Sequence, residues 1–306
     1  MQDPQFEGLP ENILATLFDM VRAQQVAQSS GDGLSIFRHI GLTEIEQIIF
    51  GISLRARSLI DFIGGAPAVR SDLYRRERWN GDEVHQALAR GCTVRINDIH
   101  LFTAPIWSFC KRLEAHFTAA VSANLYLTAP SERGLDWHAD DHDVLILQMS
   151  GMKSWEIGQI RSPILPKPPL FSFEGRKPRD PKPSLNCETS SQKTERWELR
   201  PGDILYVPAG TPHRTRTLEE LSASISIGLY FPTWADLLLG IVRANYDTIP
   251  ALADRFICGG QTDGDIGQRT MRSLLGQLAE SASYEKSEKV VLEIFSKSRN
   301  SFTRFE

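Results

Sequence analysis

A histidine and a carboxylate two positions apart are the residues of this chain whose types and spacing best suit metal chemistry. His138 and Asp140 lie in the stretch GLDWHADDHDVLILQM. In an extended strand, residues i and i+2 point to the same face, so the imidazole and the carboxylate can converge on one point. The candidate third ligand is His213, in LRPGDILYVPAGTPHRT. Two histidines and one carboxylate form the facial triad that leaves coordination positions open on non-haem Fe(II).

Three polar residues follow this pair directly. Asp141 and Asp143 alternate to the opposite face from Asp140 in a regular strand, so we expect them to surround the ligands or to face solvent. His142 shares the face of His138 and Asp140, which makes it the main rival ligand.

Lys153 is the second charge that needs an explanation. It lies in the alternating stretch KSWEI, which predicts a strand with Lys153 on one face and Ser154 on the other. A lysine on the inward face of a barrel is costly unless it meets an anion, and a dicarboxylate co-substrate would supply one. Outside such a barrel, Lys153 would be an ordinary surface lysine whose ammonium group reaches water.

Two further pairs of polar residues alternate along predicted strands. Asn124 and Tyr126 point the same way, and an amide with a phenol can hydrogen-bond carboxylate oxygens. Ser224 and Ser226 alternate with isoleucines after His213, and they either add hydroxyl groups to the same site or form the wet face of a sheet.

The elements that must position these residues form a β unit with helices at both ends. An apolar stripe predicts a helix over 11–25, and a T-x-x-E capping pattern predicts another over 45–63. Strands are expected in six stretches, which span 93–100, 122–128, 143–149, 153–158, 195–210 and 222–231. A helix opened by Thr103 and Pro105 is expected between the first and the second of them.

The second half of the chain contains an irregular excursion and a helical end. Residues 162–195 are rich in Pro, Lys and Ser, and proline removes backbone donors, so this stretch predicts a long surface insertion. Helices are expected over 233–246, 265–282 and 286–297. We therefore expect a mostly helical region over 1–94, a β domain over 95–232 and a helical region over 233–306.

Composition narrows the classes of protein. The 306 residues carry a net charge of −4, so there is no overall basic footprint for nucleic acid. The apolar runs are too short to span a bilayer, and the polar N-terminus lacks a signal-peptide core. The four cysteines are scattered without a C-x-x-C pair, which argues against a zinc site or a disulfide framework and favours a cytoplasmic location.

At these residues the chain resembles the Jumonji-C (JmjC) oxygenases of the cupin type, in particular their ribosomal-oxygenase branch. The motifs are an N-x-Y strand, H-x-D, G-x-K-x-W and PGD-x-L-Y-x-P-x-G-x-x-H, which occur here in that order over roughly 95–232. The resemblance implies a double-stranded β-helix, a cupin or jelly-roll fold that is mainly β with flanking helices.

The resemblance also implies a cofactor and a reaction. Fe(II) would be held by His138, Asp140 and His213, and 2-oxoglutarate would chelate the iron. The far carboxylate of 2-oxoglutarate would meet Lys153, with hydrogen bonds from the side chains Tyr126, Asn124 and Ser226. O2 would then drive oxidative decarboxylation to succinate and CO2, coupled to hydroxylation of an unactivated C–H bond.

The resemblance leaves the substrate open. A side chain of a protein or peptide is the first expectation, since members of the branch hydroxylate ribosomal proteins and carry a helical dimerisation region. A homodimer through 233–297 is expected on the same ground. The alternatives are a tailoring hydroxylase of a free amino acid or natural-product scaffold, and a non-catalytic cupin that binds a metabolite or partner.

Overall fold

The computed structural model describes most of the predicted β unit and parts of the regions around it. The described residues are 11–30, 60–64, 81–130, 134–159, 193–218, 220–252 and 263–281. The predicted helix over 286–297, most of the 162–195 insertion and residues 45–59 lie outside them. Of the described residues, those up to Tyr230 belong to one compact unit and those from Phe231 onward to another.

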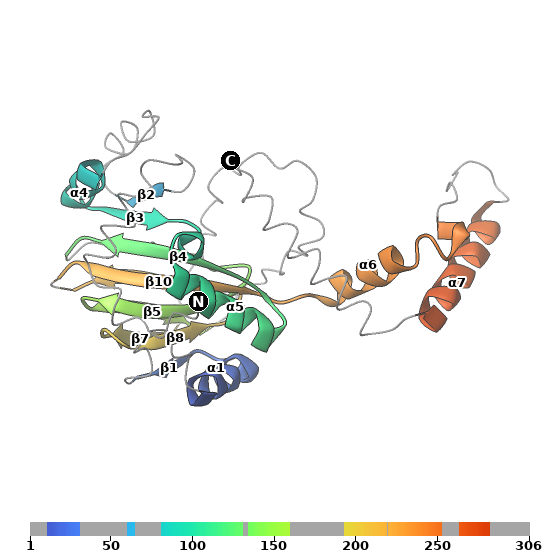
Figure 1. The fold of residues 1–306 in the computed structure, drawn as a ribbon, viewed down its shortest axis with the longest axis horizontal. Coiled ribbons are helices and arrows are strands. Elements are labelled where there is room, and N and C mark those ends of the chain that lie inside the picture. Colours follow the sequence, from blue (N-terminus) through green and yellow to red (C-terminus); the bar gives the residue numbers. More distant parts are fainter. Residues whose placement is uncertain are drawn as a thin grey trace, which may run out of the picture. The chain divides into compact units, whose positions relative to one another are not determined.

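The first unit contains every described strand (Figure 1). Its N-terminal elements are α1 (Glu11–Ala23), β1 (Ala27–Ser29), β2 (Ile60–Gly64), α4 (Gly81–Ala89) and β3 (Cys92–Ile96). They are followed by the short helix η3 (Ile99–Leu101), α5 (Ala104–Phe117), β4 (Ala120–Thr128), β5 (Asp143–Ser150), β6 (Lys153–Gly158), β7 (Thr194–Leu199), β8 (Ile204–Val207), β9 (His213–Thr217) and β10 (Ser222–Tyr230).

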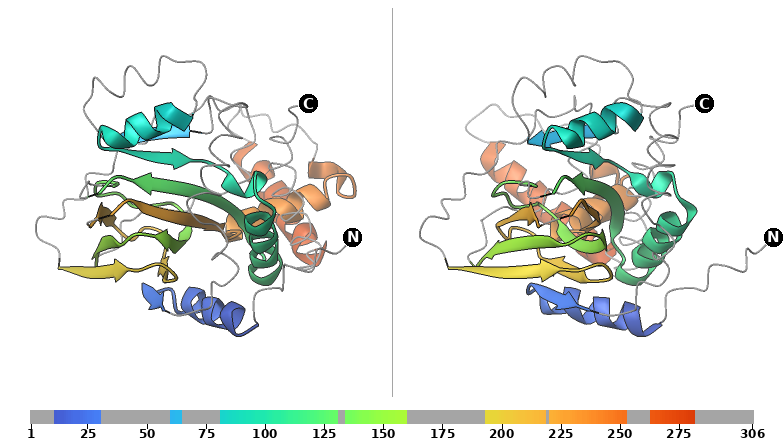
Figure 2. Two further views of the ribbon diagram at one scale, coloured as in Figure 1. Left: turned by 60° about the vertical axis from the view of Figure 1, so that its left-hand side comes forward. Right: turned by 90° about the vertical axis from the view of Figure 1, so that its left-hand side faces the viewer.

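The strands form two antiparallel sheets. The major sheet has seven strands in the order β1-β8-β5-β10-β4-β3-β2, and the minor sheet has three in the order β7-β6-β9. Strand β10 lies between β4 and β5, and its register pairs Ser226 with Asn124 on one side and with Ile146 on the other. The antiparallel two-sheet arrangement confirms the expected double-stranded β-helix (Figure 2).

Alternation along the strands gives the major sheet two different faces. On β4, Leu125 and Leu127 are buried, while Asn124 and Tyr126 are half-buried. An apolar core joins the inward face of the major sheet to the minor sheet, and it consists of Val144, Ile146, Trp155, Ile157, Leu199, Leu205 and Val207. The polar residues of β4 and β10 thus share the inward face with this core.

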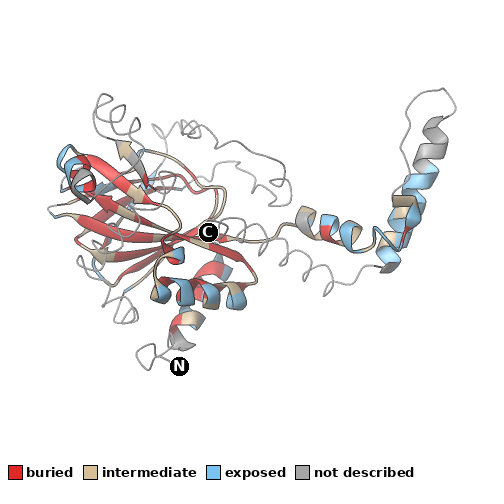
Figure 3. Ribbon diagram, turned by 45° about the horizontal axis from the view of Figure 1, so that its top comes forward, coloured by how far each residue is buried: buried red, intermediate tan, exposed pale blue. Residues whose placement is uncertain are grey.

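Helix α5 contacts β4 on the outward face of the major sheet, and α1 contacts α5. The Thr103 hydroxyl accepts a hydrogen bond from the Ile106 amide at 3.2 Å, and Pro105 lies in the first turn of α5, as the sequence predicts. Its buried side chains are Ile106, Phe109, Cys110, Leu113 and Phe117. The burial colours of Figure 3 show the resulting contrast between the inward and solvent sides of these helices.

One predicted helix is wrong at its C-terminal end. Residues 60–64 form strand β2 and pair with β3 in the register Ile60 with Ile96 and Ile63 with Thr93. Pairing with a neighbouring strand at the sheet edge outweighs the helical periodicity of this short apolar stretch. Strand β3 crosses the boundary that we expected between residues 94 and 95, since it spans Cys92–Ile96 and joins the major sheet.

Two helices of the second unit lie where the sequence predicts them, α6 (Trp234–Ala244) and α7 (Asp263–Ser281). The short helix η6 (Pro250–Leu252), between them in the sequence, was not predicted. None of the described helices combines the length and the apolar character needed to cross a membrane.

Candidate metal centre

The two candidate histidine ligands are brought together by backbone pairing. The His138 amide donates to the His213 carbonyl at 3.0 Å, and the His213 amide donates to the His138 carbonyl at 2.8 Å. This isolated bridge attaches the segment before β5 to β9, on the side of β9 away from β6. The imidazole centroids lie 4.2 Å apart as a result. The regular strand expected around His138 is therefore a single bridge.

Both imidazoles are oriented by hydrogen bonds at Nδ1. His138 Nδ1 lies 2.7 Å from the Asp136 carbonyl oxygen, and His213 Nδ1 lies 2.9 Å from the Thr211 carbonyl oxygen. A carbonyl oxygen only accepts, so each Nδ1 carries the proton and each Nε2 presents a lone pair. This is the tautomer that a metal ligand requires.

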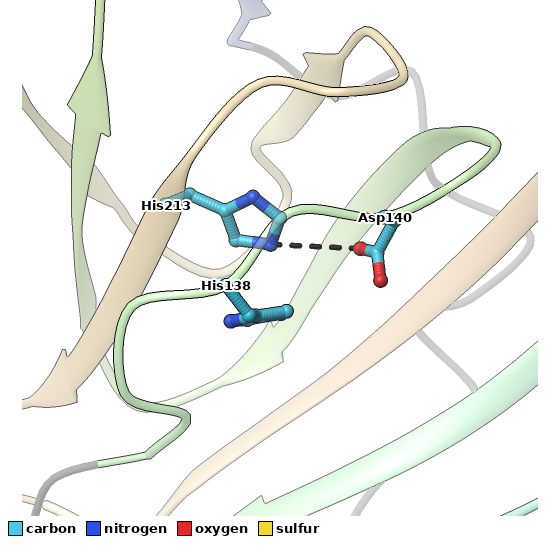
Figure 4. Close-up of side chains that lie close together, drawn as sticks. All are labelled: His138, Asp140 and His213. Atoms are coloured by element: carbon cyan, nitrogen blue, oxygen red, sulfur yellow. Dashed lines mark ion pairs between the residues drawn. The ribbon is translucent and has the colours of Figure 1, made fainter. Parts of the chain in front are cut away.

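Asp140 completes the group (Figure 4). Ligand atoms of His138, Asp140 and His213 all lie within 4.8 Å of one another, and Asp140 Oδ2 is 3.6 Å from His213 Nε2. Burial by itself would raise the pKa of Asp140, but the surrounding imidazoles, His213 first, lower it below its ordinary value. The Asp140 side chain is thus held as a carboxylate.

His213 is the most enclosed of the three ligands. Its side chain is almost fully buried, and this burial lowers its pKa to about 4, with His138 acting in the same direction. The imidazole is therefore neutral at pH 7. Two imidazoles and one carboxylate fit a divalent metal that keeps open coordination positions, as in non-haem Fe(II) sites.

Asp143 holds the turn that leads to His213. Its carboxylate accepts from the Tyr206 hydroxyl at 2.6 Å and from the Ala209 amide at 2.8 Å. The Gly210 amide donates to the Asp140 carbonyl at 2.8 Å, so the same turn also touches the other ligand segment. Strand alternation predicted only that Asp143 would lie near the ligands or face solvent. Its contact with the turn before His213 was not predicted, because sequence spacing does not show which loop crosses the end of a strand.

His142 lies outside the metal-ligand group. Its Nδ1 is 3.0 Å from the Asp141 carboxylate, and its ring stacks on Tyr230 with a centroid separation of 4.3 Å. Gly228 makes room for this stack, because a Cβ there would approach the His142 ring to 2.8 Å. Burial raises the pKa of Tyr230 to about 12, which keeps its phenol protonated.

Lys153 lies deep in the interior and has few partners for a cation. Its side chain is almost fully buried, with Nζ 3.4 Å from the Ser224 hydroxyl and 5.8 Å from the centre of the Tyr126 ring. Burial lowers its pKa to about 8, which leaves the amine protonated at pH 7. Among the described residues, this buried cation has one long hydrogen bond, an arrangement that suits an anion.

Asn124 and Ser226 continue the same face of the sheet. They are paired across β4 and β10, and they form the next pair on that face after Tyr126 and Ser224. The Asn124 Oδ1 accepts from the Asp98 amide at 3.0 Å, so its NH2 group is directed away from that contact. Lys153 donates to Ser224, whereas the hydroxyl that we expected beside the co-substrate was that of Ser226.

A comparison with known proteins matches one segment of this chain to a family. Residues 98–237, rather less than half of the chain, match the family described as JmjC domain. This segment is a JmjC domain. This matched range includes the metal-centre residues and Lys153, and the family resemblance seen in the sequence is confirmed.

The relatives of this JmjC chain include ribosomal oxygenases. Ribosomal oxygenase 2 of Rattus norvegicus is 33% identical over 61% of this chain and 40% of its own length. The bifunctional lysine-specific demethylase and histidyl-hydroxylase NO66 of Dictyostelium discoideum is 32% identical over 48% of this chain and 27% of its own length. The chain thus spans about a quarter to two fifths of these relatives.

Among solved structures, the JmjC chain is similar to YcfD, a ribosomal oxygenase from Escherichia coli solved with cobalt and 2-oxoglutarate. The two chains are 19% identical, with a TM-score of 0.42 over 67% of this chain and 51% of that one.

We predict that Lys153 costs stability in the absence of an anion. Its pKa is about 8 in the folded chain and 10.5 in a model peptide, so the unfolded chain binds more protons between these values and stability rises with pH across this window. Lys153→Met should raise the free energy of unfolding at pH 7 by up to roughly 3 kcal/mol and by much less near pH 10.

Urea unfolding of the metal-free protein at both pH values measures this difference. Lys111→Met is the matched control, because Lys111 is about half exposed and pairs with Glu114 on α5. A Lys153→Met effect that is equal at pH 7 and pH 10 would contradict a buried ammonium group.

Proposed function

We propose that this chain is an Fe(II)- and 2-oxoglutarate-dependent dioxygenase that hydroxylates an amino-acid side chain in a protein or peptide. The observation that carries the proposal is the pairing of a two-histidine, one-carboxylate group with a buried lysine in the same barrel. The first suits a metal with open positions, and the second suits an anion. The JmjC domain supports the same chemistry.

The spacing of the two sites suits a short dicarboxylate. Strand β6 pairs Lys153 with Thr217 and Ile157 with His213, so four residues separate the lysine from the partner of the metal ligand. Four residues of strand correspond to about 13 Å. The lysine and imidazole side chains each cover part of this distance, and a five-carbon diacid covers the remainder.

In this proposal, each part of the chain has a separate task. His138, Asp140 and His213 hold the iron, which with 2-oxoglutarate and O2 supplies the oxidative chemistry. Lys153, Tyr126 and Ser224 bind the far carboxylate, with Asn124 and Ser226 one pair further along the same face. The apolar core around Trp155 and Ile157 keeps water away from the buried ammonium group.

The substrate class rests on the relatives. The matched proteins are named as ribosomal oxygenases and as a histidyl-hydroxylase, and we propose a protein side chain as substrate on this ground. The stacked His142 and Tyr230 rings, with the Ser122 hydroxyl 3.5 Å from the Tyr230 hydroxyl, lie at the far end of β10 from Ser224. We propose that they contact a substrate that approaches the metal from outside.

Turnover on ribosomal proteins tests the proposal. The Fe(II)-loaded protein, incubated with 2-oxoglutarate, O2 and ribosomal proteins, should form succinate and add one oxygen atom to a protein side chain, both measurable by mass spectrometry. Asp140→Ala should reduce succinate formation to background, because two imidazoles alone hold Fe(II) poorly. Glu195→Ala, which removes an exposed carboxylate on β7, is the matched control.

Succinate without a modified ribosomal protein would reject the ribosomal substrate and retain the enzyme class. No succinate above the Asp140→Ala background would reject both.

We also propose that the second unit forms a homodimer contact. Trp234 and Leu238 are 78% and 62% exposed one helical turn apart on α6, and Met271 and Leu275 are similarly exposed on α7. Apolar residues four apart share a helix face, and two such faces offer apolar surface to a second copy.

Leu238→Asp should convert a dimer into a monomer in light scattering, because it places a charge in the apolar contact. Thr270→Asp, at an exposed polar position of α7, should leave the dimer intact. A monomeric wild-type protein at micromolar concentration would refute the contact.

A further inference from the structure

The outer face of the minor sheet carries a row of three side chains behind the metal centre. Glu156 and Arg214 are paired across β6 and β9, and Arg214 donates to Glu156 Oε2 from Nε at 2.9 Å and from Nη2 at 2.6 Å. The same guanidinium lies over the Trp137 ring, with Cζ 5.0 Å from its centre. The row therefore runs from β6 across β9 to the segment that contains His138.

This segment is held by a short set of backbone contacts to β9 and the preceding turn. The Gly134 amide donates to the Thr215 carbonyl at 3.0 Å, and the Thr215 amide donates to the Leu135 carbonyl at 3.0 Å. A Cβ on Gly134 would overlap the Thr215 hydroxyl at 2.2 Å, so the Thr215 side chain occupies the space that the glycine leaves. Beyond the His138–His213 bridge, the segment turns away toward β5.

Two residues of the row, Trp137 and Arg214, neighbour a metal ligand in the sequence. Trp137 precedes His138, and Arg214 follows His213. Consecutive residues of an extended backbone point to opposite faces, so the histidines face the interior while Trp137 and Arg214 face outward. A shift of the Trp137 ring would therefore move the His138 backbone, and with it the imidazole.

From this geometry we infer that Arg214 is a positioning residue for the metal centre. Its planar guanidinium, anchored by Glu156, lies over the Trp137 ring and holds the His138 segment against β9. Arg214 touches none of the reacting atoms, and it acts through the Trp137 backbone on the position of His138. This inference rests on the proposed metal site and adds an outer support that the ligand motif does not contain.

An ordinary surface ion pair would predict a different result. Arg214 and Glu156 side chains are 39% and 37% exposed, and a pair at this exposure contributes little to stability. A cation stacked on an indole contributes a further attraction that a neutral or non-planar side chain lacks. The two possibilities differ in whether loss of Arg214 changes the metal ligands.

The test measures Co(II) binding by calorimetry together with amide hydrogen exchange of the metal-free protein. Arg214→Ala should weaken Co(II) binding about fivefold, which corresponds to ~1 kcal/mol, and should speed exchange of the His138 amide. Arg214→Lys should lose most of the same affinity, because it keeps the charge but not the planar group. Both readouts are independent of catalytic turnover.

Arg196→Ala is the matched control on the same sheet face. Arg196 lies on β7, where it donates to the Ser154 hydroxyl at 3.0 Å and pairs with Glu198, away from the His138 segment. Its loss should leave Co(II) affinity and His138 exchange unchanged.

The double variant Trp137→Ala/Arg214→Ala should weaken Co(II) binding no more than Trp137→Ala alone, because both substitutions remove the same contact between the two side chains. Equal affinities of wild type, Arg214→Ala and Arg196→Ala, or additive losses in the double variant, would overturn the inference. Absence of Co(II) binding by the wild type would instead reject the metal site itself.

Discussion

The backbone bridge between His138 and His213 is the contact on which the site depends. The His138 segment joins β9 through two hydrogen bonds at this bridge, so the two histidines face each other across neighbouring backbones. Nδ1 hydrogen bonds to backbone carbonyls then leave both Nε2 atoms available as ligands, and His213 Nε2 lies 3.6 Å from Asp140 Oδ2. The barrel supplies the fixed position of β9, and the remaining ligand geometry follows from pairing with it.

The interior combines groups that a simple apolar core would exclude. A neutral His213, an ionised Asp140 and a protonated Lys153 are enclosed by strands whose inward face also carries an apolar core. In the proposed function, a bound species of opposite charge neutralises each charged group, a metal cation the carboxylate and a dicarboxylate the ammonium group. The proposal therefore expects both ligands to stabilise the folded chain.

The sequence predicted the ligands because strand alternation and motif order carry that information. His138, Asp140 and His213 come together, and α5 begins at its predicted cap. Alternation failed where the backbone is irregular: His142 shares parity with Asp140 but is turned toward Asp141 and Tyr230.

Contacts between strands distant in the sequence were beyond prediction from spacing. The Lys153–Ser224 contact and the Arg214–Trp137 stack depend on how the two sheets and the His138 segment are aligned. Residues 60–64 carry helical periodicity and nevertheless pair with β3, because the sheet edge offers hydrogen-bond partners that the local sequence does not reveal.

The central claim is that one barrel interior holds Fe(II) and 2-oxoglutarate together, and anaerobic titration of the Fe(II)-loaded protein with 2-oxoglutarate tests it most directly. Chelation of the iron by the 2-oxo acid should produce a visible metal-to-ligand charge-transfer band. This band should be absent in His138→Ala and should require a higher 2-oxoglutarate concentration in Lys153→Met. Bound iron without a band in the wild-type protein would contradict the account.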